Sequence, residues 1–238
     1  MSILNKIPIS ATDFVQNVFS VNPKPIFFWD TCALLDIIRL VYRNGDINTL
    51  KSIIEIKKLI DTNQIYSVCS QLTIIEWNEH FAKIMAETHE SLNLTSDFHK
   101  NSVDMINHIF SSNYCSDHIG DKGLIAELEK IADGICQAST YLTTDEIAQN
   151  ALIRVSNKQP PSAKKPEFKD CAIWETVLDV ADKVKSYGLK FVYLTVNTED
   201  YLDKARTPHR VHGSLIAEAI TYNIHLEMKF IEAYNKIK

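Results

Sequence analysis

Glycine is scarce in this chain of 238 residues, which contains only six, and no glycine-rich turn follows an apolar segment. This scarcity argues against a dinucleotide-binding fold, which needs glycines where its backbone approaches the phosphates. No Gly-x-Ser-x-Gly sequence occurs, so nothing supports a serine hydrolase of that type. The chain also lacks any run of the ~20 apolar residues that a membrane helix requires. We therefore expect no membrane partner.

The chain has no Cys-x-x-Cys pair, and its five cysteines are an odd number. Several of them lie within apolar runs, so we expect reduced and mostly buried thiols. The N-terminal segment has neither a long apolar stretch nor a small-residue cleavage site, and we expect no signal peptide. Together these features predict a cytoplasmic protein.

An excess of basic residues is also missing, because 25 Lys and Arg stand against 30 Asp and Glu, a net charge of −5. No overall positive field attracts nucleic acid. Contact with a nucleic acid would have to come from a local basic patch, or through metal ions that offset the acids.

Short apolar segments alternate with stretches of helical periodicity along most of the chain. This alternation predicts one α/β domain over residues 1–238, in three layers, with a central, mainly parallel sheet between helices. From about residue 97 to 157 the strand signal disappears, which predicts a helical insertion. The predicted strands are 24–30, 64–70, 189–196 and 224–230.

Four acids share one kind of position, near the edge where parallel sheets bind their ligands: Asp30 ends a predicted strand, Asp200 lies just past another, Glu76 lies on the helix after the second strand, and Asp170 begins the helix after the lysine-rich loop. Each alone has an ordinary explanation, such as a helix cap for Asp30 or a turn residue for Asp200. Together, Asp30, Glu76, Asp170 and Asp200 would repel one another strongly. A hard divalent cation such as Mg²⁺ or Mn²⁺ would remove that repulsion, and it prefers oxygen ligands.

The segments around these acids resemble those of the PIN domain, a metal-dependent nuclease fold. The matching pieces are FFWDT for the first acid, SVCSQLTIIE for the second, KDCAIWE for the third and TVNTEDY for the fourth. The last is the most specific, since Thr195, Asn197, Asp200 and Tyr201 fit the family's Thr-x-Asn-x-x-Asp-aromatic pattern. PPSAKKPEFKDCAIWE further resembles a PIN-like subgroup with a proline-lysine segment before the third acid. The resemblance covers about residues 25–230, and 97–157 only poorly.

The resemblance implies an endoribonuclease, toxin-type or of a related subgroup, whose four acids hold one or two Mg²⁺ or Mn²⁺ ions. It implies RNA as substrate and an antitoxin or inhibitor protein as a further partner, and a homodimer stays open. Two such ions can activate a water and stabilise the leaving oxygen of a phosphodiester. Thr31, Ser70, Thr195 and Asn197 are residue types that orient carboxylates, although turn and cap chemistry would also explain them. The subgroup resemblance adds Glu175 as a supporting residue.

The clearest local basic cluster lies beside the third acid and consists of Lys158, Lys164, Lys165 and Lys169. It could hold the phosphate backbone of a single strand, or it could be a solvated loop. For Trp29, Trp77 and Trp174 we favour core packing over base stacking.

Two other functions compete with the nuclease hypothesis. A phosphatase with Asp30 as nucleophile would need a second acid two residues later, where the chain has Cys32. A catalytically inactive PIN-like scaffold that binds RNA or protein stays open, although all four acids are present. His209 and His212 lack a third partner at ligand spacing, so we favour surface histidines.

Overall fold

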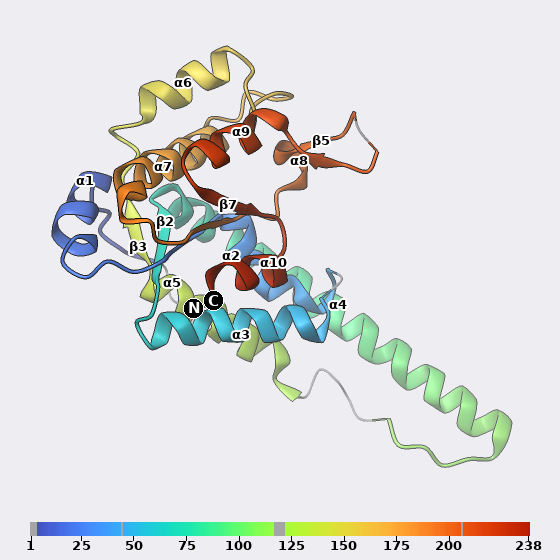
Figure 1. Cartoon of the computed structure of the whole chain (residues 1–238). Helices are drawn as coiled ribbons and strands as arrows, with labels where there is room; N and C mark the ends of the chain where they lie inside the picture. Colours follow the sequence, from blue (N-terminus) through green and yellow to red (C-terminus); the bar gives the residue numbers. More distant parts are fainter. Residues whose placement is uncertain (1–3, 44, 117–121, 206) are drawn as a thin grey trace.

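The computed structural model describes residues 4–43, 45–116, 122–205 and 207–238. Its centre is a five-stranded parallel sheet in the spatial order β3-β2-β1-β4-β7, shown in Figure 1. A separate antiparallel ribbon pairs β5 with β6. The strands are β1 (Ile26–Trp29), β2 (Tyr66–Ser70), β3 (Thr140–Leu142), β4 (Phe191–Leu194), β5 (Leu202–Asp203), β6 (Arg210–Val211) and β7 (Ile224–Glu227).

The central strand β1 explains why its sequence is apolar without a break. All four of its residues are buried, since β2 and β4 flank it and both faces of the sheet are covered. Phe27 and Trp29 belong to one core cluster, whereas Ile26 and Phe28 belong to another on the opposite face. Strands buried on both faces read as continuous apolar runs rather than alternating ones.

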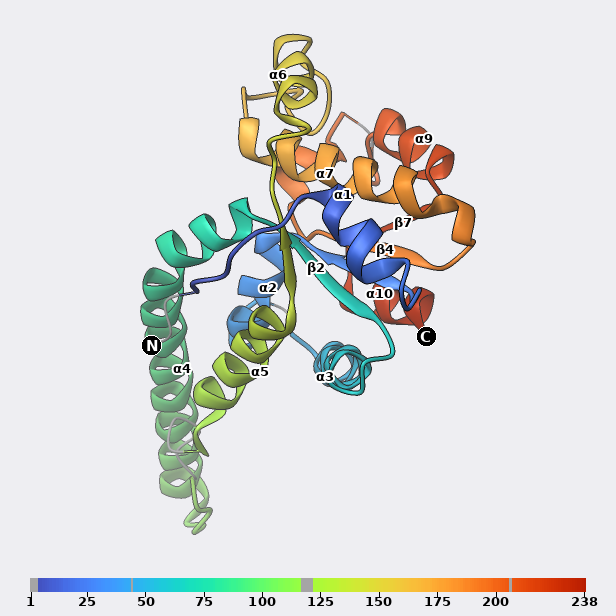
Figure 2. The same cartoon turned by 90° about the vertical axis from the view of Figure 1, so that its left-hand side faces the viewer.

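Helices cover both faces of the sheet and complete the three predicted layers (Figure 2). One face carries α2 (Thr31–Ile38), α3 (Ile47–Asp61), α4 (Leu72–Phe110), α5 (Leu124–Ala138) and α10 (Phe230–Ile237). The other carries α1 (Ala11–Asp13), the π-helical turn η1 (Phe14–Phe19), α6 (Ala148–Ser156), α7 (Phe168–Val184) and α9 (Gly213–Thr221). Short helical turns are η2 (Arg39–Val41), η4 (Lys185–Tyr187) and α8 (Thr198–Tyr201). The predicted fold class is therefore confirmed.

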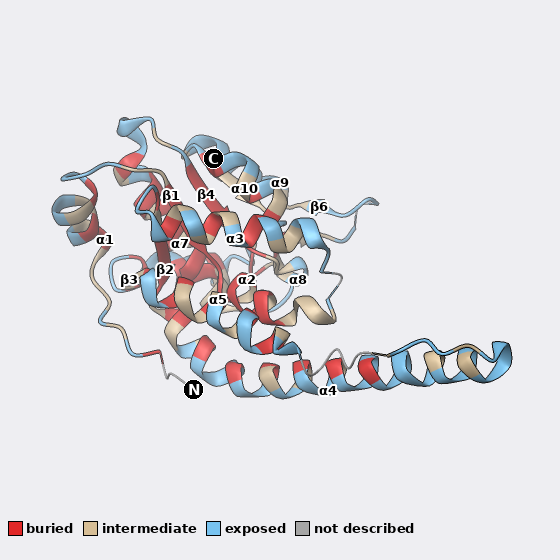
Figure 3. Ribbon diagram, turned by 90° about the horizontal axis from the view of Figure 1, so that it is seen from below, coloured by how far each residue is buried: buried red, intermediate tan, exposed pale blue. Residues whose placement is uncertain are grey.

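Helix α4 differs from the prediction, because its 39 residues run past residue 97, where the insertion was expected to begin. The buried face of the helix ends at Ser96, and the remainder extends beyond the body as an arm (Figure 3). The helix stops at Ser111, whose φ of 49° lies in the left-handed region. The stretch predicted to be helical also contains β3, which pairs with β2. Three residues are too few for periodicity to identify a strand.

Asp200, for which a turn residue was the ordinary explanation, lies in the short helix α8. Asn197 is its N-cap and accepts hydrogen bonds from two backbone amides, which accounts for the helical turn. The ribbon β5–β6 that follows was not predicted. No helix in the described part of the chain is both long and apolar enough to cross a membrane.

Candidate active site

Asp30 lies directly after β1, at the carboxyl edge of the sheet, and is 2% exposed. It occupies the N-cap position of α2, yet its side chain makes no capping hydrogen bond there. Its Oδ2 instead accepts a hydrogen bond of 2.5 Å from Thr195 Oγ1, just past β4. Burial raises the pKa of Asp30 to about 7; the charge of Glu76 adds to the rise and the Thr195 hydrogen bond opposes it. The backbone amides of Thr31 and Cys32 at the start of α2 also lower its pKa, so this carboxylate interacts with the helix start as well as with Thr195.

Asn197 connects the third and fourth acids. Its Nδ2 donates to Asp170 Oδ1 at 3.2 Å and to Asp200 Oδ2 at 3.0 Å. Its Oδ1 accepts from the backbone amides of Glu199 and Asp200, which begins α8. One side chain thus fixes the helical turn that carries Asp200 and holds that acid beside Asp170, which lies in the first turn of α7.

The four acids act on one another electrostatically. Burial is the largest reason that the pKa of Asp170 rises to about 8, and the charges of Asp30, Asp200 and Glu76 add to the rise. Burial likewise raises the pKa of the Cys32 thiol, with further contributions from Asp30 and Asp170. The four carboxyl groups are therefore electrostatically coupled at the carboxyl edge of the sheet.

Lysines from the loop before α7 and from the first turn of α7 reach the same edge. Lys169 Nζ lies 3.1 Å from Glu79 Oε2 and 4.0 Å from Glu76 Oε1. Lys164 Nζ donates to the carbonyl of Glu199 at 3.2 Å. The pKa of Glu199 is lowered mainly by Lys204, and Lys164 and Lys165 make smaller contributions. Lys158 instead lies just after α6, where its amide donates to the carbonyl of Val155.

Two of the supporting residues have other neighbours than expected. Ser70 Oγ accepts from the Leu72 amide at 3.3 Å, which is helix-start chemistry. Glu175, a candidate for supporting the site, accepts from Arg154 Nε at 2.7 Å. Arg154 also binds the carboxylate of Glu218, whose Oε2 accepts from Trp174 Nε1.

The role of Arg154 was not predicted from the sequence. Its side chain, on a residue that is 5% exposed, links α6 to α7 and α9 through ion pairs with Glu175 and Glu218. Its NH1 also donates to the carbonyl of Pro160 at 2.7 Å, so it anchors the start of the lysine-rich loop. Its only sequence signal is a cation between apolar residues of a short helix. The three tryptophans, by contrast, are buried in the core as we favoured.

The chemistry of the donor groups fits a metal ion, whereas the positions of the side chains do not form a complete metal site. Clustered acids of which two, Asp30 and Asp170, have a raised pKa are typical of a cation site. The Thr31 hydroxyl beside Asp30 is buried and has no hydrogen-bond partner in the described part of the chain. Among the described residues, however, no three His, Cys, Asp or Glu side chains are arranged as they stand to hold a metal ion. The donor set therefore fits Mg²⁺ or Mn²⁺ in chemistry, without a closed ligand shell.

Comparison with known proteins identifies the family. The PIN domain family matches residues 27–201, which begin in β1 and end with α8, and this range contains all four acids. Searches of curated proteins and of solved structures gave no significant match. PIN domains are usually nucleases, and the toxin-type subgroup has no support from these comparisons. Because the match covers well over half of the chain, the protein belongs to the PIN domain family.

Proposed function

We propose that the chain is an Mg²⁺- or Mn²⁺-dependent endoribonuclease that hydrolyses RNA phosphodiesters. One observation carries this proposal: four acids from four separate elements meet at the carboxyl edge of a parallel sheet, where the charge of Glu76 helps to raise the pKa of Asp30, and the charges of Asp30, Asp200 and Glu76 help to raise that of Asp170. Such repulsion costs stability and is retained where the acids have another task. Membership of a family of nucleases supports the same reaction class.

The proposed roles follow from the contacts of each residue. Asp30, Glu76, Asp170 and Asp200 would hold the ion or ions, which supply an activated water and charge stabilisation when bound. Thr195 orients Asp30, and Asn197 orients Asp170 and Asp200. In this mechanism no side chain is a nucleophile.

Substrate would approach between the acids and the lysine-rich loop. Lys164, Lys165 and Lys169 can contact a phosphate backbone there, since Lys164 and Lys169 already bond to groups beside the acids. Lys158, which we also expected to bind RNA, would contact only a longer strand because it follows α6. An antitoxin or inhibitor protein and a cytoplasmic location rest on the sequence alone.

An inactive RNA- or protein-binding scaffold is the second candidate. It is favoured by one observation, the absence of a closed ligand arrangement among the described side chains. In that case the acids would bind no ion tightly, and RNA would bind without being cut.

The two candidates are separated by cleavage of short single-stranded RNAs with Mn²⁺ by the purified protein. We expect cleavage that EDTA and Asp30→Asn both abolish, while Asp182→Asn, an exposed acid on α7, leaves it unchanged. Circular dichroism checks that each variant is folded. RNA binding with no cleavage under any divalent ion would favour the scaffold, and cleavage that persists in EDTA would refute the mechanism.

A further inference from the structure

The two edges of the central sheet differ in whether another segment pairs with the edge strand. At the β3 edge, the N-terminal segment adds a bridge: the Ile9 amide donates to Tyr141 and the Thr143 amide donates to Ile9, both at 2.9 Å. At the opposite edge, β7 pairs with β4, and no further strand follows it in the described sheet. An open edge strand offers backbone groups to another chain, and proteins usually cover or blunt it.

The backbone of β7 is suited to such pairing. The Glu227 carbonyl accepts from the Thr195 amide at 3.1 Å on the β4 side. Because successive residues of a strand direct their backbone groups to opposite edges, the amide and carbonyl of Leu226 point to the open side. The β4–β7 register runs through all four residues without a bulge, and the strand contains no proline. Proline and a bulge, two of the features that block an edge, are therefore missing from β7, although the strand is only four residues long.

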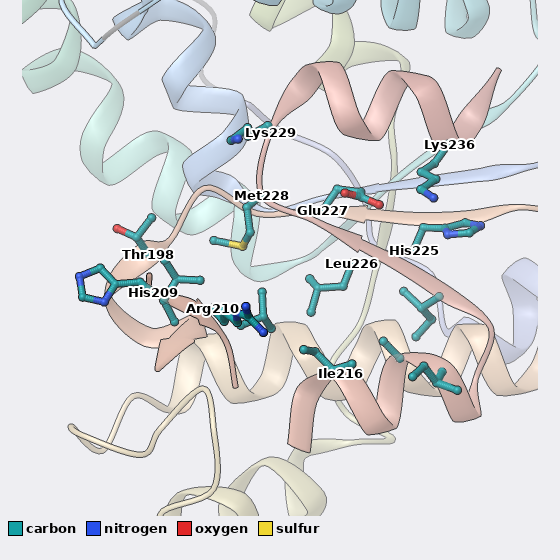
Figure 4. A pocket seen from close by; sticks show the side chains of 15 residues that line it. Thr198, His209, Arg210, Ile216, His225, Leu226, Glu227, Met228, Lys229 and Lys236 are labelled. Atoms are coloured by element: carbon teal, nitrogen blue, oxygen red, sulfur yellow. The ribbon is translucent and has the colours of Figure 1, made fainter. Parts of the chain in front are cut away.

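A groove of about 650 Å³ runs along this edge, between α9 and the ribbon β5–β6 (Figure 4). Its apolar wall includes Leu226 of β7 and two residues of α9, Ile216 and Ile220, which are 42% and 74% exposed. Leu226 and Ile216 approach each other on the α9 side of the strand, whereas His225 and Lys236 lie on the α10 side (Figure 4). A strand added at this edge would thus meet one apolar and one polar flank.

The groove is basic although the chain as a whole carries a net charge of −5. Its lining includes Arg210, Lys229 and Lys236, and Glu227 is the one acid among the described residues that line it. Lys229 has an ion pair of 3.4 Å with Glu232, at the exposed start of α10. Charge complementarity therefore favours an acidic occupant.

We propose that the β7 edge binds an extended acidic peptide segment of another protein by strand addition. Backbone bonds to Leu226 would supply affinity, and alternate side chains would supply specificity. Apolar side chains of the peptide would face Leu226, Ile216 and Ile220, and its acids would face Lys236 and Lys229. RNA fits this groove less well, because no Phe, Tyr or Trp lines it in the described part of the chain and unpaired bases stack on such rings.

The test uses a fluorescein-labelled octapeptide of alternating Val and Glu, capped at both ends, and fluorescence anisotropy with the full chain. Two matched probes accompany it: an alternating Val and Lys octapeptide, and the Val-Glu peptide with N-methyl groups on alternate residues. We expect the Val-Glu peptide to bind at least tenfold more tightly than either. Binding should also slow hydrogen exchange of the Leu226 amide.

Variants locate the site without touching the four acids. Ile220→Glu, at an exposed position of α9, should weaken binding of the Val-Glu peptide at least tenfold, as should Lys236→Glu. Leu152→Glu, at an apolar position of α6 that is 56% exposed, should leave binding unchanged. Circular dichroism confirms folding of each.

Several outcomes would overturn the proposal. Equal binding of the N-methylated or lysine probe would mean that strand addition or charge complementarity is wrong, and no binding of the Val-Glu peptide would reject the site. Binding of oligouridylate that Ile220→Glu abolishes would make the groove an RNA surface. A dimer in sedimentation that Ile220→Glu dissociates would mean that a second copy of the chain occupies it.

Discussion

Replacing Asp170 by asparagine should stabilise the protein in EDTA, because the wild-type carboxylate is held at a cost. Its pKa rises from 3.8 to about 8, mainly through burial and then through its acidic neighbours. Each pKa unit corresponds to about 1.4 kcal/mol, so the ceiling for the relief at high pH is about 6 kcal/mol. We expect about 1–3 kcal/mol, since the remaining acids relax around a charge that is removed. The amide oxygen that the substitution introduces can still accept the hydrogen bond that Asn197 donates to Asp170 in the wild type.

The sign of the effect depends on pH in a way that identifies its cause. A group whose folded pKa is raised stabilises the folded state fully below the unfolded pKa. That contribution is lost as the pH rises through the folded pKa. The advantage of Asp170→Asn should therefore be absent near pH 4 and should grow up to about pH 8.

The assay is thermal unfolding in EDTA from pH 4 to pH 8.5, with Asp182→Asn as the control. About 1–3 kcal/mol corresponds to a Tm increase of roughly 2–12 °C for a chain of this length. The control, at an exposed acid of the same helix paired with Lys185, should change little. A large loss of stability in Asp170→Asn, or a gain that is constant across pH, would refute the reasoning. Adding Mn²⁺ should stabilise the wild type more than the variant, because the variant lacks one ligand.

Three further outcomes are expected. Asn197→Ala should lower Tm, because the loss of a helix cap costs about 1 kcal/mol of stability. It should also reduce Mn²⁺ affinity about 10–100-fold in titration calorimetry, since the Asn197 side chain orients two acids. Thr195→Val should raise the pKa of Asp30 further above 7, by roughly one unit in a ¹³C NMR carboxyl titration, because the opposing hydrogen bond is removed; an unchanged or lower pKa would contradict this. Arg154→Leu should cost about 3–5 kcal/mol in urea unfolding, since Glu175 and Glu218 lose their buried partner; near-wild-type stability would contradict it.

The fold could be predicted where burial on both faces leaves no alternative reading of the sequence. The segment around β1 is apolar at every residue because helices cover both faces of the sheet there. The short strand β3 could not be found in this way, because it has three residues and its identity depends on pairing with β2. The length of α4 was also not predictable, since a helix that leaves the body loses the apolar stripe that marks its end.

The positions of Asp30 and Asp200 in the fold could be predicted because strand ends are visible in the sequence, and parallel strands end at a shared edge. The residues that hold these acids were predictable only where they lie close to a strand end, as Thr195 and Asn197 do. Arg154 is 21 residues from Glu175 and 64 from Glu218 in the sequence. No local sequence pattern predicts ion pairs between residues so far apart.

The lysines show why adjacency in the sequence is an incomplete guide to a binding surface. Lys158, Lys164, Lys165 and Lys169 form one cluster in the sequence, yet the chain turns at the end of α6 and separates the first from the others. Lys169 pairs with Glu79, which is 90 residues earlier in the sequence. Glu79 lies one helical turn beyond Glu76 on α4, so this ion pair places Lys169 beside the acids. A phosphate bound there would have to compete with Glu79 for the same ammonium group. The positive charge of Lys169 at the start of α7 is therefore already partly neutralised, and this would weaken the hold of the lysine cluster on RNA until ions occupy the acids.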